Sequence, residues 1–260
     1  MQSADVMTTP NAARVYDYLL GGRHNFEVDR QAAAVMTALL PTTPIWLRRL
    51  RRFLHQSVVH LAAEGFDSFL DLASGLPTDD HIHATAPGAR VVYVDSDPLV
   101  VEYGRKLIGT QPHVRYLQAD LRDIDGVLGA APVQEVLGGA GRLAIGLNAV
   151  TCFLSDDDIA RVARTLYDWA PDGSRVFATF ETKAPEAMTP KLEQFLAMFE
   201  QMGTTYHFLT LERAKELMQP WQPDRRGFQA LSDLLEPRDP VAPDEREGVD
   251  LEFYGAILQK

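Results

Sequence analysis

Short continuous apolar runs alternate with amphipathic stretches from residue 68 onward. Such runs are typical of strands that are buried on both faces of a parallel sheet. They predict strands over residues 68–72, 90–94, 114–118, 142–147 and 175–180. The stretches between the runs space their apolar residues as helices do, most clearly over 98–108 and 156–169. This alternation predicts an α/β fold in which helices cover both faces of a mostly parallel sheet.

Residues before the first predicted strand follow a helical pattern only. Apolar residues recur at helical spacing over 11–20, 29–40 and 43–65, and Gly21-Gly22 and Pro41 end the first two of these stretches. Thr43 and Pro44 supply an N-cap and a first-turn proline for the third helix. We therefore expect residues 1–66 to form a helical extension or lid, and residues 67–260 to form the core domain.

The part of the chain after the fifth predicted strand returns to the sheet only at its end. A helix over 190–202, capped by Thr189, is followed by a short β-like run over 204–209 and a helix over 211–218. A proline-punctuated stretch then leads to a strand pattern over 251–258. We expect the sixth and seventh strands to pair as a hairpin at the sheet edge.

Carboxylates end the first two predicted strands. Asp71 and Asp95 lie 24 positions apart, and Asp71 leads into the small-residue turn Ala73-Ser74-Gly75. In an open α/β sheet, ligands bind at the carboxyl ends of the strands, where such a turn lets the backbone approach a nucleotide. A dinucleotide fingerprint would need glycines at Ala73, Gly75 and Thr78, and only one is present, so a nicotinamide cofactor is disfavoured.

Asp71 suits a ligand that carries a cationic amino group near its ribose, because a carboxylate there would repel a pyrophosphate. S-adenosylmethionine (SAM) is such a ligand. Asp95 would accept hydrogen bonds from the ribose, Asp120 in Ala119-Asp120-Leu121 would meet the adenine amino group, and Asn148 would face the crevice. Each acid alone could instead cap a helix, since Asp95 precedes Ser96-Asp97-Pro98. Three acids at successive strand ends favour a shared ligand.

The sequence resembles the actinobacterial SAM-dependent methyltransferases of the DUF574 group over nearly its whole length. The matching segments are 13–22 (Ala-Arg-Val-Tyr-Asp-Tyr-Leu-Leu-Gly-Gly), Asn25-Phe26, Asp29-Arg30, 69–71, 75–78, 92–95 and 254–256. The resemblance implies a class I fold, Rossmann-like and seven-stranded, with order 3-2-1-4-5-7-6 and an antiparallel last strand. It implies SAM as cofactor, S-adenosylhomocysteine (SAH) as product, and a cofactor site of Tyr16, Tyr18, Gly22, Asn25, Asp71, Ala73, Ser74, Gly75, Asp95, Ser96, Asp120, Leu121 and Asn148.

The substrate-facing half departs from the pattern of that family. His24 stands where the family has an aspartate, His81 where it tends to have an asparagine, and Cys152 and Glu181 where it tends to have histidines. Methyl transfer needs mainly alignment of the acceptor and sometimes a base. We take Glu181, His24 and His81 as candidate catalytic residues, with Glu181 either a base or a carboxylate that binds an amine.

Three other features have a structural and a functional interpretation. Cys152 is expected to pack as a small hydrophobe, and His81 with His83 forms an H-x-H pair without further ligands in view, so no metal site is predicted. Gly21-Gly22 either ends a helix or hinges a lid over the cofactor, the role that the resemblance favours. The arginines at 48, 49, 51 and 52 are expected to form a solvated face, and otherwise an anchor for an anionic substrate or a partner chain.

Composition limits the classes of partner and the compartment to be expected. The 260-residue chain has a net charge of −11, which disfavours nucleic acid and anionic membranes as partners. Its single cysteine, Cys152, excludes an internal disulfide and indicates a reducing compartment. No stretch approaches the length of a membrane span, and residues 1–10 lack the pattern of a signal peptide. We expect a soluble cytoplasmic protein that acts on a small molecule, with a homodimer or a heteromer with a related chain left open.

The leading hypothesis is transfer of a methyl group from SAM to a small molecule, in actinobacterial secondary metabolism. A second hypothesis keeps the cofactor but replaces methyl transfer by an elimination, cyclisation or rearrangement, prompted by Cys152 and Glu181. A third is a subunit of a heteromeric biosynthetic enzyme whose helix over 45–65 contacts the partner. Formation of SAH with product separates the first from the second, and activity of the isolated chain argues against the third.

Overall fold

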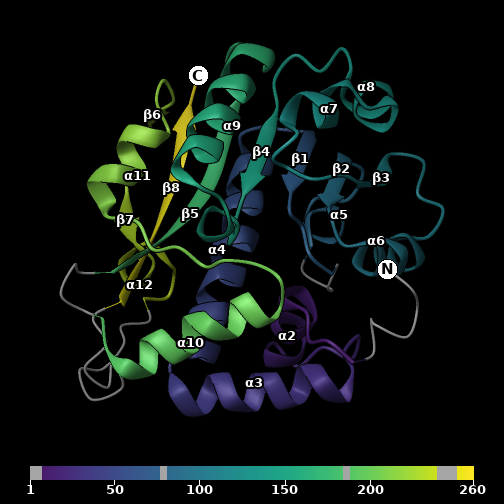
Figure 1. Ribbon diagram of the computed structural model, residues 1–260. Helices are drawn as coiled ribbons and strands as arrows, with labels where there is room; N and C mark the ends of the chain where they lie inside the picture. Colours follow the sequence, from purple (N-terminus) through teal and green to yellow (C-terminus); the bar gives the residue numbers. More distant parts are fainter. Residues whose placement is uncertain (1–7, 77–80, 184–187, 239–250) are drawn as a thin grey trace.

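The computed structural model describes residues 8–76, 81–183, 188–238 and 251–260. Within these ranges the centre of the molecule is an eight-stranded sheet with the order β3-β2-β1-β4-β5-β8-β6, in which β7 also pairs with β8 (Figure 1). Strands β1 to β5 run parallel and β8 runs antiparallel to β5. Their bounds are β1 Ser68–Leu72, β2 Arg90–Asp95, β3 Val114–Gln118, β4 Ala144–Leu147, β5 Arg175–Lys183, β6 Gln222–Pro223, β7 Gln229–Ala230 and β8 Leu251–Gln259.

The fold class expected from the sequence is confirmed, with a difference at the sheet edge. The run over 204–209, expected to be β-like, adds only one bridge, from Leu209 to Thr182. The reason is that β8 covers one edge of β5 along its whole length and β4 covers the other edge as far as Ala178, so the segment reaches an open part of β5 only at Leu209. The sixth strand of the expected seven is replaced by β6 and β7, which both pair with β8.

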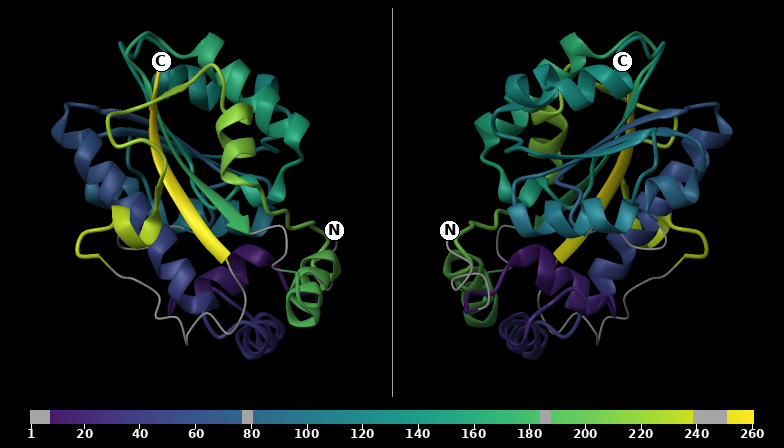
Figure 2. Two further views of the ribbon diagram at one scale, coloured as in Figure 1. Left: turned by 90° about the vertical axis from the view of Figure 1, so that its left-hand side faces the viewer. Right: turned by 90° about the vertical axis from the view of Figure 1, so that its right-hand side faces the viewer.

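Helices cover both faces of the sheet and also one end of it (Figures 1 and 2). One face packs against α7, α8, α9 and α11, and the other against α4, α5, α6 and α12, each through a large apolar cluster. The helix bounds are α2 Ala12–Leu19, α3 Glu27–Leu39, α4 Thr43–Ala63, α5 Ile82–Thr85, α6 Pro98–Ile108, α7 Ile124–Gly129, α8 Ala131–Leu137, α9 Asp156–Trp169, α10 Pro190–Gln201, α11 Leu211–Leu217 and α12 Leu231–Leu234.

Helix α4 belongs to the layer that covers the sheet. Its Phe53 packs so closely on β8 that a Cβ atom at Gly255 would lie 2.6 Å from the ring. The expectation of a solvated arginine face holds for Arg48, which is exposed. It is wrong for Arg49, which is fully buried with its guanidinium over the Trp46 ring, and for Arg51, which is buried against His81. Burial of the aliphatic stems and stacking of the guanidinium make arginine compatible with such sites. The division of the chain at residue 66 stays a prediction.

A third apolar cluster joins α2 and α3 to α10, although these helices are far apart in the sequence (Figure 2). The buried carboxylate of Asp29 holds the two N-terminal helices together, since it accepts hydrogen bonds from Asn11 N, Phe26 N and Arg14 Nε at 2.8–3.0 Å. Asn11 caps α2 and donates its amide to Asp97 of the loop after β2 at 2.6 Å. The cluster is thereby fixed over the carboxyl ends of the strands.

Candidate active site

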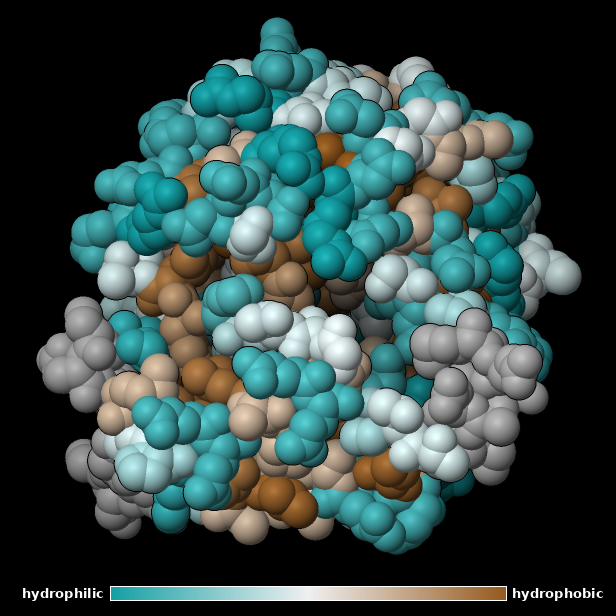
Figure 3. Space-filling view, viewed as in Figure 1, coloured by the Kyte–Doolittle hydropathy of each residue, from teal (hydrophilic) through white to brown (hydrophobic). Residues whose placement is uncertain are grey.

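A cavity of about 840 Å³ lies between the carboxyl ends of the strands and the cluster of α2, α3 and α10. In Figure 3 the hollowed middle of this face shows hydrophobic side chains between two hydrophilic borders. The volume is within the 300–1,000 Å³ typical of pockets for small ligands. It is polar where β1, β2 and β4 end and aromatic where α10 and the segment after it form the wall.

The turn after β1 forms the floor of the polar half. Ala73 and Gly75 both have positive φ angles, of 55° and 64°, so the chain bends sharply directly after the strand. Ser74 ties the turn to β2, because its N–H donates to the Val94 carbonyl at 2.9 Å. The Gly75 N–H donates to Asp95 Oδ2, also at 2.9 Å. The turn therefore brings Asp71, Ser74, Gly75 and Asp95 to one wall of the cavity, as expected from the sequence.

The helix-cap alternative for Asp95 does not apply. Asp97 caps α6, because its Oδ1 accepts from the N–H groups of Leu99 and Val100. Asp95 instead accepts from the backbone of Gly75 and of Asp97 and lines the cavity. Burial raises its pKa above the usual value for an aspartate. Its neighbour Ser96 also lines the cavity.

Asp71 is buried at the end of β1, and burial raises its pKa to about 7. Arg51 partly offsets this rise and the charge of Asp95 adds to it. Its Oδ2 has no hydrogen-bond partner among the described residues. Gly146 of β4 leaves the space that the carboxyl occupies, since a Cβ there would lie 2.5 Å from Asp71 Oδ1. A buried acceptor without a donor is unfavourable, so the site is suited to a ligand that donates.

Asn148 presents a second such atom after β4. Its Oδ1 is buried without a hydrogen-bond partner in the described part of the chain, and it lines the same cavity as Asp71. Ala149, at a positive φ of 56°, turns the chain directly afterwards. Two buried oxygen acceptors at neighbouring strand ends fit a ligand with an ammonium group, because an ammonium offers three donors and no acceptor. These residues therefore fit the aminoacyl end of SAM.

Asp120 and Leu121 line the cavity beyond β3. The Asp120 carboxylate is partly exposed and forms a two-pronged ion pair with Arg122, with contacts of 2.6–3.1 Å. This pairing and its hydrogen bonds hold the pKa of Asp120 below its usual value. The carboxylate is therefore charged, and its role towards adenine stays a prediction.

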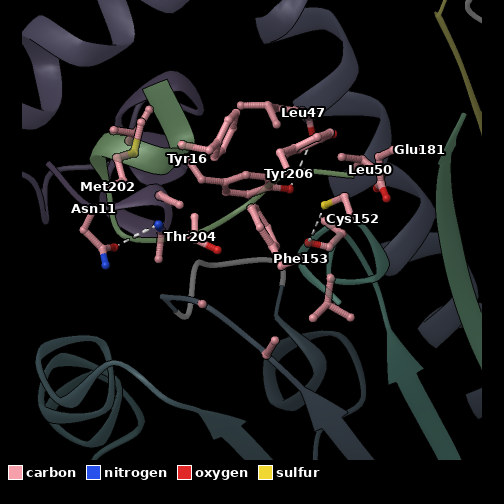
Figure 4. A pocket seen from close by; sticks show the side chains of 18 of the residues that line it. Asn11, Tyr16, Leu47, Leu50, Cys152, Phe153, Glu181, Met202, Thr204 and Tyr206 are labelled. Carbon is pink, nitrogen blue, oxygen red and sulfur yellow. Dashed lines mark hydrogen bonds between the residues drawn. The ribbon is translucent and has the colours of Figure 1, made fainter. Parts of the chain in front are cut away.

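Aromatic side chains form the opposite wall, and sequence reasoning did not place them at the site. Tyr206 lies at the centre of this wall, with its ring centroid 4.7 Å from that of Phe199 and 5.5 Å from that of Phe153 (Figure 4). Phe195 and Phe208 complete the aromatic wall, which we define as these five residues. The spacing of Phe195 and Phe199 in one helix indicated a shared face, but not what that face would meet.

Glu181 and Cys152 are buried where the aromatic wall meets β5 (Figure 4). The Glu181 carboxyl accepts hydrogen bonds from the hydroxyls of Thr151 at 3.2 Å and Thr179 at 3.4 Å. Burial raises the pKa of Glu181, and burial with the nearby carboxyl raises that of Cys152. The thiol is therefore neutral and inert, and the expected packing of Cys152 as a small buried side chain is confirmed.

Several expected site residues lie outside the lining of this cavity. Tyr16 lines it, but Tyr18, Gly22, His24 and Asn25 do not. The chain after α2 folds back on Asp17, whose Oδ2 accepts from His24 N at 2.9 Å and from Asn25 Nδ2 at 3.0 Å. A Cβ at Gly22 would lie 2.1 Å from Asp17 Oδ1. These contacts give the turn a structural explanation, and its expected role as a lid stays a prediction.

His81 is also absent from the cavity lining. It is fully buried beside Arg51 and packs 5.0 Å from the Tyr93 ring, and burial lowers its pKa so that the ring is neutral. Pro77 and Thr78, which carry part of the family resemblance, lie outside the described residues. Within the described ranges, no group of three or more His, Cys, Asp or Glu side chains is placed to hold a metal ion.

Comparisons with known proteins identify the family and the fold. A family model described as S-adenosyl methyltransferase matches residues 2–223. The chain is similar to a candidate methyltransferase from Thermobifida fusca (31% identity, TM-score 0.85, 99% of this chain and 97% of the other). It is also similar to a DUF574 family protein from Streptomyces avermitilis (26% identity, TM-score 0.83, 98% of each chain). A search of curated proteins gave no match.

A more distant structure shares the fold alone. It is the phosphoethanolamine N-methyltransferase 2 of Haemonchus contortus, in complex with phosphomonomethylethanolamine and SAH (10% identity, TM-score 0.54, 95% of this chain and 57% of the other). None of the described helices is both long and apolar enough to span a bilayer.

Proposed function

This chain belongs to the S-adenosyl methyltransferase family, and we propose that it transfers the methyl group of SAM to a small apolar molecule held against the aromatic wall. SAM is the methyl donor of the family, and when bound it supplies a methyl group activated by a positively charged sulfur. The observation that carries the proposal is a single cavity with two unlike halves, one lined by strand-end acids and the other by aromatic rings.

The polar half fits the cofactor. Asp71 and Asn148 each hold a buried oxygen acceptor without a partner among the described residues, which suits the ammonium of SAM. Asp95 is held by Gly75 N–H at the edge of the turn, where its carboxyl meets the ribose hydroxyls. Asp120 and Leu121 then bound the space for the adenine. Hydrogen bonds from the ligand satisfy groups that are otherwise buried and unpaired.

The aromatic half fits the acceptor. Phe195 and Phe199 of α10 and Tyr206 after it present large apolar surfaces that exclude water from the end of the cavity nearest β5. A macromolecular acceptor is disfavoured, because residues of α2 and α3 line the far side of the cavity and the net charge of −11 repels nucleic acid. The proposal is therefore a small-molecule methyltransferase.

Two measurements on the purified protein test the proposal. Calorimetric titration with SAM and with SAH is expected to give binding of both, and incubation with SAM and a library of small apolar molecules is expected to form SAH together with a methylated product. Absence of binding by both ligands would refute the cofactor site. Conversion of a library member without formation of SAH would favour an elimination or rearrangement instead.

A further inference from the structure

Glu181 lies in the acceptor half of the cavity, apart from the acids that fit the cofactor. It stands near the carboxyl end of β5, and β4 separates β5 from β1, which carries Asp71. Since neighbouring strands are about 4.8 Å apart, this places the β5 backbone roughly 10 Å from that of β1. At this distance from Asp71, Glu181 lies beyond the aminoacyl end of the cofactor, on the side of the aromatic wall.

The carboxyl of Glu181 has only weak or shared donors for a buried acid, one of them the neutral thiol of Cys152. The Thr151 hydroxyl has one hydrogen, and it is closer to the Thr179 carbonyl at 2.9 Å than to Glu181 Oε2 at 3.2 Å. The Thr179 hydroxyl accepts from Ala149 N at 2.7 Å and reaches Glu181 Oε1 only at 3.4 Å. Within the described residues Glu181 forms no salt bridge. A buried carboxylate normally has several such partners.

The titratable groups beside Glu181 are Cys152 and Tyr206, and burial raises the pKa of each, so both are neutral. The Glu181 carboxyl therefore meets aromatic rings and neutral hydroxyl and thiol groups rather than a protein cation. A ligand ammonium would complete this environment, because a carboxylate and aromatic faces together attract a desolvated cation. A neutral or anionic ligand would leave the charged form of Glu181 uncompensated.

We propose that Glu181 binds the amino group of the acceptor, so that the substrate is an amine on an apolar, ring-bearing body and is methylated on nitrogen. This inference rests on the proposed methyltransferase function. The ring-bearing body lies against Tyr206, Phe199 and Phe153, and the nitrogen lies between Glu181 and the polar half of the cavity.

The carboxyl also removes the proton that would block methylation. An ammonium has no electron pair to give, so its N–H bond must break first, with the proton passing to a Glu181 carboxyl oxygen and the electron pair staying on nitrogen. That pair then forms the new bond to the methyl carbon while the sulfur keeps the pair of the broken bond. The neutral acid left behind is stabilised, because burial raises the pKa of Glu181.

The experiment is a calorimetric titration of the SAH-loaded protein at pH 7. The probes are phenethylamine and tryptamine, each compared with the alcohol of the same skeleton, phenethyl alcohol and tryptophol. Each amine is expected to bind about 10- to 150-fold more tightly than its alcohol, the range for one charge-assisted hydrogen bond. In Glu181→Gln this preference is expected to disappear, while SAH affinity stays unchanged. Glu193→Gln, which removes an exposed carboxylate from α10, is expected to keep the preference.

The possible outcomes separate the two proposals. Loss of SAH binding in the unmodified protein would refute the methyltransferase site itself. Normal SAH binding with equal affinity for amines and alcohols, or with binding of none of the four probes, would overturn the amine proposal alone. A preference for amines that persists in Glu181→Gln would assign the ammonium site to another residue.

Discussion

Replacement of Asp71 by asparagine removes a charge from the end of β1 and keeps the shape of the side chain. If the carboxylate binds the ammonium of SAM, the variant loses one charge-assisted hydrogen bond, which is worth about 1.5–3 kcal/mol. The dissociation constant for SAM should therefore rise about 10- to 150-fold at pH 7.5. Asparagine still offers an oxygen acceptor, and a neutral hydrogen bond to it keeps part of the affinity. The rise of the dissociation constant should therefore lie nearer the lower end of this range.

The pH dependence of SAM binding gives a sharper test than the affinity alone. In the free protein the pKa of Asp71 is about 7 because the group is buried. An ammonium binds the ionised form, so affinity should fall as pH falls, by about fivefold from pH 7 to pH 6 and by nearly tenfold for the next unit. The ligand ammonium stays protonated over this window, because α-amino groups titrate at about 7.7–8.0.

Calorimetry at several pH values measures both effects. Burial also raises the pKa of Asp95, so titration of Asp95 adds to the pH dependence of SAM binding. The prediction therefore concerns the difference in pH dependence between the parent protein and the variants. Asp71→Asn should lower the slope of log affinity against pH by about one below pH 6, and Glu193→Gln should leave it unchanged. A variant that keeps both the affinity and the full slope would refute the assignment of Asp71 to the ammonium.

The same substitution should act on stability in the opposite direction. Burial raises the pKa of Asp71 from 3.8 in the unfolded chain to about 7 in the folded protein. This group therefore makes the fold more stable below pH 3.8 than at high pH, and this added stability is lost as the pH rises through about 7. Ionised Asp71 costs on the order of 4 kcal/mol at pH 8 without ligand. Asp71→Asn should therefore unfold at higher urea concentration than the parent at pH 8, although it binds SAM less well.

Three further substitutions test the scaffold. Asp29→Ala removes the buried carboxylate that joins the N-terminal helices, and it should lower the free energy of unfolding by about 3–5 kcal/mol in urea denaturation. A loss below about 1 kcal/mol would contradict this structural role of Asp29. Gly146→Ala places a Cβ 2.5 Å from Asp71 Oδ1 and should weaken SAH binding in a titration, so unchanged affinity would show that the carboxyl can move away freely. Gly22→Ala crowds the Asp17 carboxylate and should destabilise the fold by about 1–3 kcal/mol, while the folded protein keeps its SAH affinity. Weaker SAH binding at normal stability would instead favour the lid interpretation.

The sequence predicted β1 to the residue, because burial on both faces leaves an unambiguous apolar run. The end of β5 was predicted at residue 180, three residues too early, because Glu181 is polar although it is buried within the strand. Helix 98–108 was predicted to the residue, since Asp97 and Pro98 fix its start. The choice for Asp95 between a helix cap and a ligand contact was left open by the sequence, because an acid in that position fits both, and the backbone geometry decides it.

The environment of the arginines and the acceptor half of the cavity could not be predicted for a related reason. Arg49 and Arg51 are polar in any hydropathy pattern, and their burial depends on Trp46 and on His81, which lies 30 residues away from Arg51. Tyr206 and Phe208 follow a strand-like alternation, but β4 covers this edge of β5 as far as Ala178, and the segment meets β5 only at Leu209. Tertiary competition of this kind leaves no local signal.

The position of β8 has a consequence for synthesis of the protein. Nine residues of β8 pair with nine of β5, and among the described strands β6 and β7 join the sheet through β8 alone. On the ribosome, β8 can therefore pair with β5 along its whole length only after residue 259 has left the exit tunnel. Until then the nascent chain presents the apolar edge of β5 unpaired, which is the kind of edge that recruits strands from other chains. Slow translation after residue 183 would prolong that exposure, and we expect the yield of native protein to depend on chaperones that shield β5 in that interval.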